Sequence, residues 1–200
     1  GVQAAVEPYV SPVEGLHVTA ADLDGDGDLD LLATSYSSSG GAGAVEWYEN
    51  TDGAGSFGSA QSIASEAEPW FTCVGDLDGD GDLDVASILR EGADLFWNEN
   101  TDGLGSFGAK QSIYGPFEEG WWVQAADVDS DGDLDLVASD TEEGSVSWFP
   151  NDGGGRFAGR VVIRRSLASA LAGDLGDLDG NSGLLDRVFA AVPAVGGADS

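Results

Sequence analysis

Short apolar runs alternate along the chain with clusters of glycine, aspartate and asparagine. Around the middle of the chain, these runs lie at Trp70–Gly75, Asp84–Leu89, Leu95–Asn98 and Phe107–Tyr114. Runs of this length that are bounded by turn-forming residues are typical of β-strands. Because no segment carries a sustained apolar stripe at helical spacing, the pattern predicts an all-β protein built of short strands.

The same pattern recurs along the chain. An aspartate-rich segment reads DLDGDGDLDLLATS from Asp22, DLDGDGDLDVASIL from Asp76 and DVDSDGDLDLVASD from Asp127, so the first aspartates are 54 and 51 residues apart. An aromatic element with asparagine, glycine and phenylalanine follows in step, at Trp47–Phe57, Trp97–Phe107 and Trp148–Phe157. Four strands in each repeat of about 50 residues are typical of a β-propeller blade.

We therefore expect one propeller domain over residues 1–200, with complete four-stranded blades at about 16–64, 70–114 and 121–165. A degenerate fourth copy, DLDGNSGLLDRVFAAV, starts at Asp177 and predicts a partial blade over 167–200, to which residues 1–6 would add a last strand. The chain begins at Gly1 and contains no methionine, so we expect it to be part of a longer translation product. Two alternatives stay open: a small four-bladed ring, or a larger propeller completed by additional blades or by self-association.

Composition adds a strong acidic imbalance, with 37 Asp and Glu against 7 Lys and Arg and a formal charge of -30. Residues 1–155 hold 32 of the acids and only two bases, Arg90 and Lys110. Such a surface repels nucleic acid phosphates, and the absence of an 18-residue apolar run argues against insertion into a membrane. At 42% apolar residues, the chain is nevertheless composed like a folded protein, so the acids must lie on a folded scaffold.

The aspartate loops have the pattern of a metal site. Side chains at positions 1, 3 and 5 converge when a glycine at position 6 lets the backbone turn, while position 7 offers its carbonyl and position 9 a further carboxylate. These hard oxygen ligands suit Ca²⁺, and the absence of His and Cys argues against zinc or copper. The predicted ligands are Asp22, Asp24, Asp26, Asp28 and Asp30; Asp76, Asp78, Asp80, Asp82 and Asp84; and Asp127, Asp129, Asp131, Asp133 and Asp135, with Asp28, Asp82 and Asp133 acting through their carbonyls.

Two other interpretations of these loops are weaker. An EF-hand needs a glutamate at position 12, where the loops have Ala33, Ser87 and Ala138, and it needs flanking helices. Solvated acidic turns without metal would not require three near-identical copies in register. A fourth loop keeps Asp177, Asp179 and Asn181, but its turn glycine and its ninth-position carboxylate are missing, which leaves a fourth metal site doubtful.

The DxDGDGxxD loops and the aromatic elements resemble the FG-GAP or VCBS-type repeats of integrin α-chain propellers and of many secreted proteins. The resemblance is strong over about residues 16–165 and weak at the ends. It implies a propeller whose calcium loops join the first and second strands of each blade, and it implies adhesion or ligand recognition more often than catalysis. Integrin-like propellers usually have seven blades, which this chain does not provide.

Blade topology predicts which loops share a face. The calcium loops lie on one face together with the turns between the third and fourth strands, and the remaining connections lie on the opposite face. On that face we expect aromatic residues that offer a ligand surface, although packing between blades is the competing interpretation. The candidates are Tyr36, Trp70, Phe117, Trp121 and Trp122. Trp47, Trp97 and Trp148 lie in register within a strand and are expected in the core.

Catalysis has little support from the residues. The lone histidine, His17, and the lone cysteine, Cys73, lie in strands next to calcium loops and are expected to pack there. No nucleophile motif or phosphate-binding glycine loop occurs. We therefore expect a non-catalytic, calcium-binding β-propeller, located outside the cell, that mediates adhesion or protein recognition. The alternatives are a carbohydrate-binding lectin and an accessory domain of a secreted enzyme such as a polysaccharide lyase.

Overall fold

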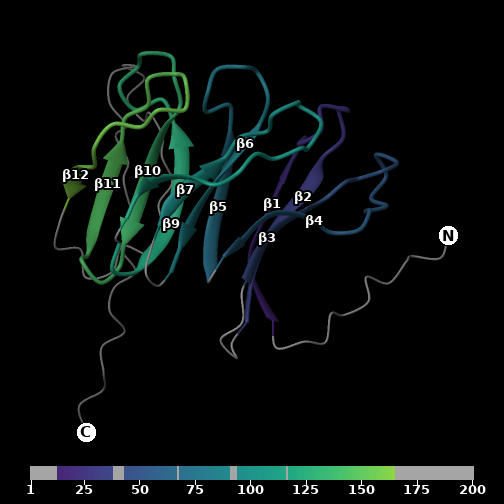
Figure 1. Cartoon of the computed structure of the whole chain (residues 1–200), viewed down its shortest axis with the longest axis horizontal. Helices are drawn as coiled ribbons and strands as arrows, with labels where there is room; N and C mark the ends of the chain where they lie inside the picture. The colour runs from purple at the N-terminus through teal and green to yellow at the C-terminus, as the bar shows by residue number, and fades with distance from the viewer. Residues whose placement is uncertain (1–12, 38–42, 67, 91–93, 116, 165–200) are drawn as a thin grey trace, which may run out of the picture.

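The computed structural model describes residues 13–37, 43–66, 68–90, 94–115 and 117–164, which form three four-stranded antiparallel sheets (Figure 1). The first sheet contains β1 (Val13–Ala21), β2 (Asp30–Ser37), β3 (Gly43–Tyr48) and β4 (Gln61–Glu66); the second contains β5 (Pro69–Gly75), β6 (Asp84–Leu89), β7 (Leu95–Asn98) and β8 (Gln111–Tyr114); the third contains β9 (Gly120–Ala126), β10 (Asp135–Asp140), β11 (Ser145–Phe149) and β12 (Val161–Arg164). Within each sheet, every strand pairs with the next one in the sequence. These ranges contain no helix, and hence none that would cross a membrane.

The fourth strand of the repeat is shorter than the sequence predicts. We expected it to start at Phe107, but β8 starts at Gln111. Phe107 instead forms an isolated bridge with Asn100, and the amide of Gly108 donates to the carbonyl of Glu99 at 2.7 Å. The turn between β7 and β8 is therefore longer than the pattern predicts, because Phe107 and Gly108, which we expected in the strand, pair with the start of the turn instead.

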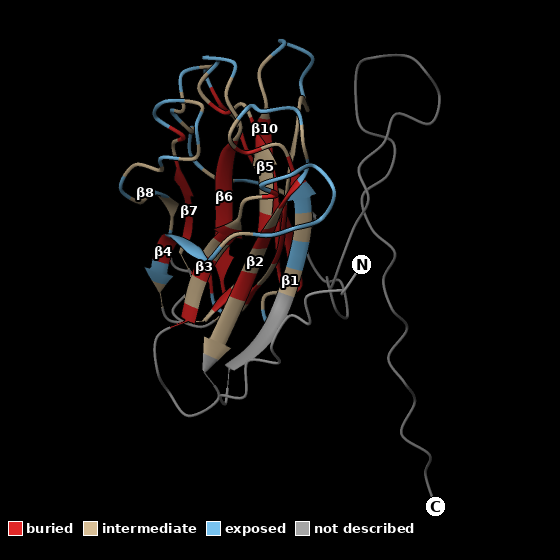
Figure 2. Cartoon of the chain, turned by 90° about the vertical axis from the view of Figure 1, so that its right-hand side faces the viewer, coloured by how far each residue is buried: buried red, intermediate tan, exposed pale blue. Residues whose placement is uncertain are grey.

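The sheets pack against one another as blades, with β1, β5 and β9 as neighbours on the inner side. The middle sheet is covered on both faces, so every residue of β6 and β7 is buried, as Figure 2 shows for these strands. In β3 of the first sheet, burial alternates along the strand, as expected when only one face is covered. The predicted all-β fold of propeller-type blades is confirmed, and the described sheets do not close into a ring.

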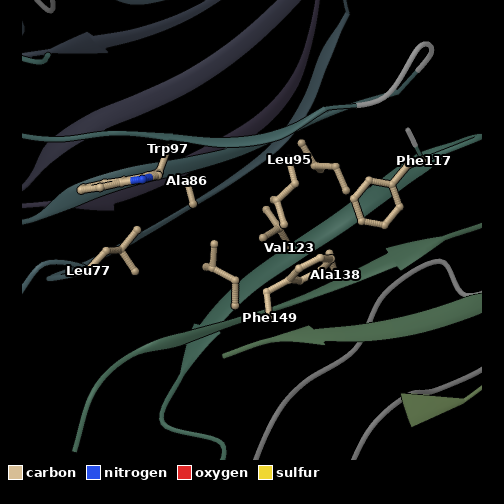
Figure 3. Packing of buried hydrophobic residues seen from close by; sticks show 10 residues of the cluster. Leu77, Ala86, Leu95, Trp97, Phe117, Val123, Ala138 and Phe149 are labelled. Carbon is tan, nitrogen blue, oxygen red and sulfur yellow. The ribbon is translucent and has the colours of Figure 1, made fainter. Parts of the chain in front are cut away.

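Two apolar clusters fill the spaces between the blades. The cluster between the first and second sheets includes Leu32, Val45 and Phe96. The cluster between the second and third sheets includes Leu95 and Phe149 (Figure 3). Neighbouring residues of one strand thus face different clusters. Successive side chains of a strand point to opposite faces of the sheet, so β6 and β7, which are covered on both faces, carry apolar residues on both.

The tryptophans of the aromatic elements contact the following blade. Trp47 and Trp97 are only 2% and 3% exposed, which confirms the prediction that they are core residues. A Cβ atom added at Gly105 would lie 2.2 Å from Cζ2 of Trp47, and one added at Gly155 would lie 2.4 Å from Cζ2 of Trp97. Each ring is therefore covered by a glycine from the next sheet. Trp148 is only half-buried, which corrects the expectation for this residue, because no described sheet packs on its face.

In the second and third sheets, an asparagine in the turn between the third and fourth strands links the blade to the previous one. The Nδ2 atom of Asn100 donates to the carbonyl of Leu23 in the previous blade at 2.9 Å, and Nδ2 of Asn151 donates to the carbonyl of Leu77 at 2.7 Å. All four residues are buried. The hydrogen bonds therefore fix the angle between blades at the loop face, where water does not compete for them.

The two basic residues of the acidic region both lie at blade junctions. Nζ of Lys110 lies 3.1 Å from Oε2 of Glu66 in the first sheet, and Nε of Arg90 lies 3.3 Å from Oε1 of Glu119, which precedes the third sheet. Partly exposed ion pairs of this kind contribute at most about 1 kcal/mol each. They neutralise charge where acidic blades would otherwise repel one another.

The predicted fourth blade, over 167–200 with residues 1–6, lies outside the described residues, as do Asp177, Asp179 and Asn181. Closure of the ring by further blades or by a second copy remains a prediction.

Candidate metal centres and the opposite face

Each aspartate loop joins the first and second strands of its sheet, as the sequence predicts. In the first loop the glycines at positions 4 and 6 have φ values of 73° and 95°, which glycine adopts at little cost. In all three loops the amide of the sixth-position glycine donates to the carboxylate at position 1. These bonds are Gly27 to Asp22 at 3.0 Å, Gly81 to Asp76 at 3.0 Å and Gly132 to Asp127 at 3.2 Å. The left-handed turn thus brings the loop back over its first aspartate.

The carboxylates at positions 1, 3 and 9 converge in each loop. One carboxylate oxygen from each lies within 4.8 Å of the others, in the groups Asp22, Asp24 and Asp30; Asp76, Asp78 and Asp84; and Asp127, Asp129 and Asp135. The ninth-position aspartate is buried in every loop. These three of the five predicted ligands are therefore brought together three times over.

The buried ninth aspartate also anchors the loop to the rest of its sheet. Oδ2 of Asp84 accepts the amide of Leu77 at 2.9 Å, and its Oδ1 accepts the amide of Asn100 at 2.8 Å. The first and third loops repeat both bonds with Asp30 and Asp135. The same carboxylate thus holds the loop against the turn between the third and fourth strands, which confirms that both lie on one face.

The aspartates at positions 5 and 7 lie outside these groups. At position 5, the carboxylates of Asp26, Asp80 and Asp131 accept the amide at position 7, at 2.9 to 3.0 Å. At position 7, the carboxylates lie against a turn glycine of the same sheet, as Asp82 lies against Gly103. The role of Asp28, Asp82 and Asp133 as ligands through their carbonyls stays a prediction.

The electrostatics of these groups suit the binding of a cation. Burial raises the pKa of Asp84 to about 7, and it also raises the pKa values of Asp24, Asp78 and Asp135, with repulsion from neighbouring carboxylates adding to it. One carboxylate oxygen of Asp22 and one of Asp127 are buried and have no hydrogen-bond partner among the residues that the structure describes. Closely spaced, buried carboxylate oxygens that lack donors are the environment that a hard cation such as Ca²⁺ satisfies.

On the opposite face, three half-buried rings form a row with one ring from each sheet. Tyr36 lies near the end of β2, and Trp70 and Trp121 lie near the starts of β5 and β9. The ring centroids of Tyr36 and Trp70 are 6.2 Å apart, and those of Trp70 and Trp121 are 4.7 Å apart. The guanidinium carbon of Arg90 lies 4.9 Å from the centroid of Trp70. We call Tyr36, Trp70 and Trp121 the aromatic row.

The other two aromatic candidates are not available on this face. Phe117 is 2% exposed and Trp122 is 4% exposed. Phe117 packs edge-on against Tyr114 and Phe149 in the cluster between the second and third sheets. Their burial corrects the expectation that these side chains offer a ligand surface. Phe117 packs between blades, whereas Trp122 packs against Val137 and Val146 of its own sheet.

The candidate acid/base and nucleophile residues have packing roles, as expected. The His17 ring stacks on Phe71 at 3.7 Å, and its Nδ1 lies 3.1 Å from Oγ1 of Thr72. Burial lowers the pKa of His17, and burial raises the pKa of the Cys73 thiol to about 12. At neutral pH the imidazole is therefore uncharged and the thiol protonated, which makes Cys73 a poor nucleophile.

Comparison with known families places these repeats. The model of the FG-GAP-like repeat matches residues 22–87, 76–138 and 127–186, and each match begins at the first aspartate of a loop. The chain belongs to the FG-GAP-like repeat family. Each matched range contains the aspartate loop at which it begins and the aromatic element that follows it. None of the curated proteins with which the chain was compared matches it.

Several solved structures resemble this FG-GAP-like chain in fold. An Agrocybe aegerita lectin that recognises non-reducing terminal N-acetylglucosamine matches with a TM-score of 0.58 and 23% identity, over 82% of this chain and 44% of the lectin. The rhamnogalacturonan lyase YesW matches with a TM-score of 0.54, and a Bacillus licheniformis rhamnogalacturonan lyase with 0.53; both are 14% identical and cover 86% of this chain and 39% of the lyase. The chain therefore spans less than half the length of each, and the likeness shows the fold alone.

The sequence pattern includes the turn asparagines of the FG-GAP-like repeats, but it did not predict their hydrogen-bonding role. The amides of Asn50, Asn100 and Asn151 donate to the ninth aspartate of their own loop, and their side chains bond to loop carbonyls. The signal was present, because the asparagine stands three residues before a glycine in the first two repeats and two before it in the third. By contrast, nothing in the sequence indicated that Glu68 adopts a left-handed backbone conformation, with a φ of 53°.

Proposed function

We propose that this FG-GAP-like chain is a non-catalytic recognition module whose three aspartate loops bind Ca²⁺. The supporting observation is the convergence of the carboxylates at positions 1, 3 and 9, repeated in three loops with the same hydrogen bonds. Calcium would be held by these carboxylates and would neutralise charge that burial otherwise penalises. The chain's own contribution is to orient the carboxylates through the buried ninth aspartate.

Calcium would then act as a stabiliser of the module. Extracellular calcium modules have dissociation constants of about 0.1 to 1 mM. At a tenfold excess of free calcium, each site adds about 1.4 kcal/mol to the free energy of unfolding, so three sites add about 4 kcal/mol. Since domains are stable by only about 5 to 15 kcal/mol, a module with such sites would depend on millimolar calcium, and we propose that it acts outside the cell.

The test uses protein stripped of metal, with melting followed during a calcium titration and binding measured by calorimetry. We expect three equivalents of calcium and a large rise in melting temperature. Asp78→Asn should remove about one equivalent, whereas Asp102→Asn, an exposed acid in the turn of the same sheet, should remove none. If neither calcium nor a chelator changes the melting curve, the assignment of the loops as metal sites is wrong.

Two partner classes fit a module of this kind: an extracellular protein, as in adhesion, or a glycan. The structural neighbours support the second, since one is a glycan-recognising lectin and two are polysaccharide lyases. The same neighbours support the role of an accessory domain in a secreted enzyme that acts on polysaccharides. A glycan array probed in the presence of calcium separates the partners, because adhesion through a protein predicts no reproducible hit.

A further inference from the structure

We propose that the aromatic row of Tyr36, Trp70 and Trp121 is a platform for neutral sugar rings, with Arg90 and Glu119 as its flanking hydrogen-bonding groups. This inference rests on the recognition role proposed above and names the ligand class for one face of the module.

The rings of the row contact one another as a tilted series, with interplanar angles of 50° between Tyr36 and Trp70 and 47° between Trp70 and Trp121. They lie at the end of the sheets opposite the aspartate loops, one from each blade, and successive centroids are 6.2 and 4.7 Å apart. All three side chains are half-buried, so packing fixes them while part of each stays accessible. The apolar C–H faces of a pyranose ring stack on such surfaces, because an aromatic face attracts the partly positive hydrogens.

The polar groups beside the row are held in place before any ligand arrives. Oε1 of Glu119 accepts from Nε of Arg90 at 3.3 Å, and Oε2 of Glu119 accepts from Oγ1 of Thr141 at 2.6 Å. The backbone of Arg90 is fixed too, because its amide donates to the carbonyl of Glu68 and its carbonyl accepts the amide of Gly120, both at 3.1 Å. Fixed guanidinium and carboxylate groups recognise hydroxyl groups with little loss of entropy.

The backbone next to the row is strained. Glu68, two residues before Trp70, has a φ of 53°, which costs a residue other than glycine about 1 to 2 kcal/mol. Its Oε2 is buried without a hydrogen-bond partner among the described residues. Strain and unsatisfied polar atoms of this kind cluster at binding sites, where the geometry serves a ligand rather than the fold.

Charge selects the class of sugar. The net charge of -30 repels polyanions, and the charge of Arg90 beside the row is already paired with Glu119. No unpaired cation therefore remains at the row, among the described residues, for a uronate or a phosphate. A cationic ligand would be repelled by the guanidinium of Arg90, which lies over the ring of Trp70. A neutral sugar avoids both conflicts.

The apolar surface of the chain lies elsewhere, which disfavours a protein interface at the row. The exposed large apolar side chains of the described residues lie on the loop face, on β1 and on the outer strand β12. They are Val18, Leu29, Phe57, Leu104, Val161 and Ile163. Protein interfaces usually centre on an apolar, fully buried core, and the row with its paired charges provides none.

Calorimetry in saturating calcium tests the proposal with chitotetraose and cellotetraose as neutral probes and tetragalacturonate as the acidic probe. We expect at least one neutral probe to bind and the acidic probe not to bind. Tyr36→Ala and Trp121→Ala should each weaken binding about tenfold or more, a factor that corresponds to 1.4 kcal/mol. Leu104→Ala, an exposed apolar residue on the loop face, is the matched control and should leave the affinity unchanged.

Indole N–H signals in NMR spectra provide a second measurement that does not depend on how the variants fold. Titration with the bound probe should shift the signals of Trp70 and Trp121 and leave those of the buried Trp47 and Trp97 in place. Preference for tetragalacturonate, absence of binding by both neutral probes, shifts confined to other tryptophans, or a protein partner on this face without glycan binding would each overturn the proposal. Calcium-dependent melting in the same samples separates this failure from failure of the module assignment.

Discussion

Replacement of Gly105 by alanine tests the packing between blades. Gly105 has a φ of 79°, so alanine there adopts a left-handed conformation that costs about 1 to 2 kcal/mol. The new Cβ would also lie 2.2 Å from Cζ2 of Trp47, a ring that is 2% exposed and has no free space to enter. Overpacking of this kind costs about 1 to 3 kcal/mol more. We therefore expect Gly105→Ala to lower the free energy of unfolding by about 2 to 5 kcal/mol.

Gly55 provides the matched control, because it occupies the same place in the first repeat. Its φ is 92°, and a Cβ there would meet nothing within 4 Å. Gly55→Ala should thus show only the conformational cost of about 1 to 2 kcal/mol. Gly155→Ala, whose Cβ would lie 2.4 Å from Cζ2 of Trp97, should behave like Gly105→Ala.

Urea unfolding in saturating calcium, followed by tryptophan fluorescence, measures all three variants. For a chain of this size, 1 kcal/mol corresponds to about 2 to 4 °C in melting temperature, so thermal melting provides an independent check. If Gly105→Ala and Gly55→Ala differ by less than about 0.5 kcal/mol, the ring of Trp47 is not confined by the following blade, and the account of blade packing is wrong.

Three further predictions concern the loops and the Cys73 thiol. Burial raises the pKa of Asp84 to about 7, so folding of the metal-free protein favours the protonated carboxyl, and its stability should fall as the pH rises from about 4 to about 7. The calcium-bound protein should instead gain stability over this range, because calcium binds the ionised carboxylate. Melting temperatures of metal-free Asp84→Asn should depend less on pH. Cys73, with its pKa raised to about 12, should resist iodoacetamide at pH 8 in the folded protein and react in denaturant; rapid native labelling, followed by mass spectrometry, would contradict this. Asn100→Ala should lower the free energy of unfolding by about 1 to 3 kcal/mol because it removes the buried hydrogen bond to the Leu23 carbonyl of the previous blade. Asn50→Ala loses only bonds within its own sheet, to Leu29 and Gly55, and should cost less in the same urea assay.

The blades and the loops were predictable because their signals are local. A strand such as Asp84–Leu89 is bounded by turn residues on both sides, and its limits in the structure agree with the prediction. The aspartates at positions 1, 3 and 9 converge because glycines within the same nine residues set the backbone turn. Three copies in register made these signals stronger than a single copy would have been.

The burial of individual aromatic residues could not be predicted in the same way. Phe117 and Trp122 lie near Trp121 in the sequence, yet Phe117 enters the cluster between the second and third sheets and Trp122 a cluster of the third sheet, while Trp121 stays half-exposed. Which side of a sheet is covered depends on the neighbouring blade, and the sequence near a strand does not specify it. Trp148 illustrates the same point, since its pattern matches Trp47 but its face is not covered by a described sheet.

The asparagine bonds between blades have a consequence for how the chain responds to metal. The side chain of Asn100 donates to the carbonyl of Leu23 in the first loop, and its backbone amide donates to Asp84, the ninth aspartate of the second loop. Ordering of one loop is thereby transmitted to the next, as in a one-dimensional lattice with nearest-neighbour coupling. Occupancy of the loops should spread cooperatively from blade to blade, and the distance over which it spreads would measure how stiff the array of blades is.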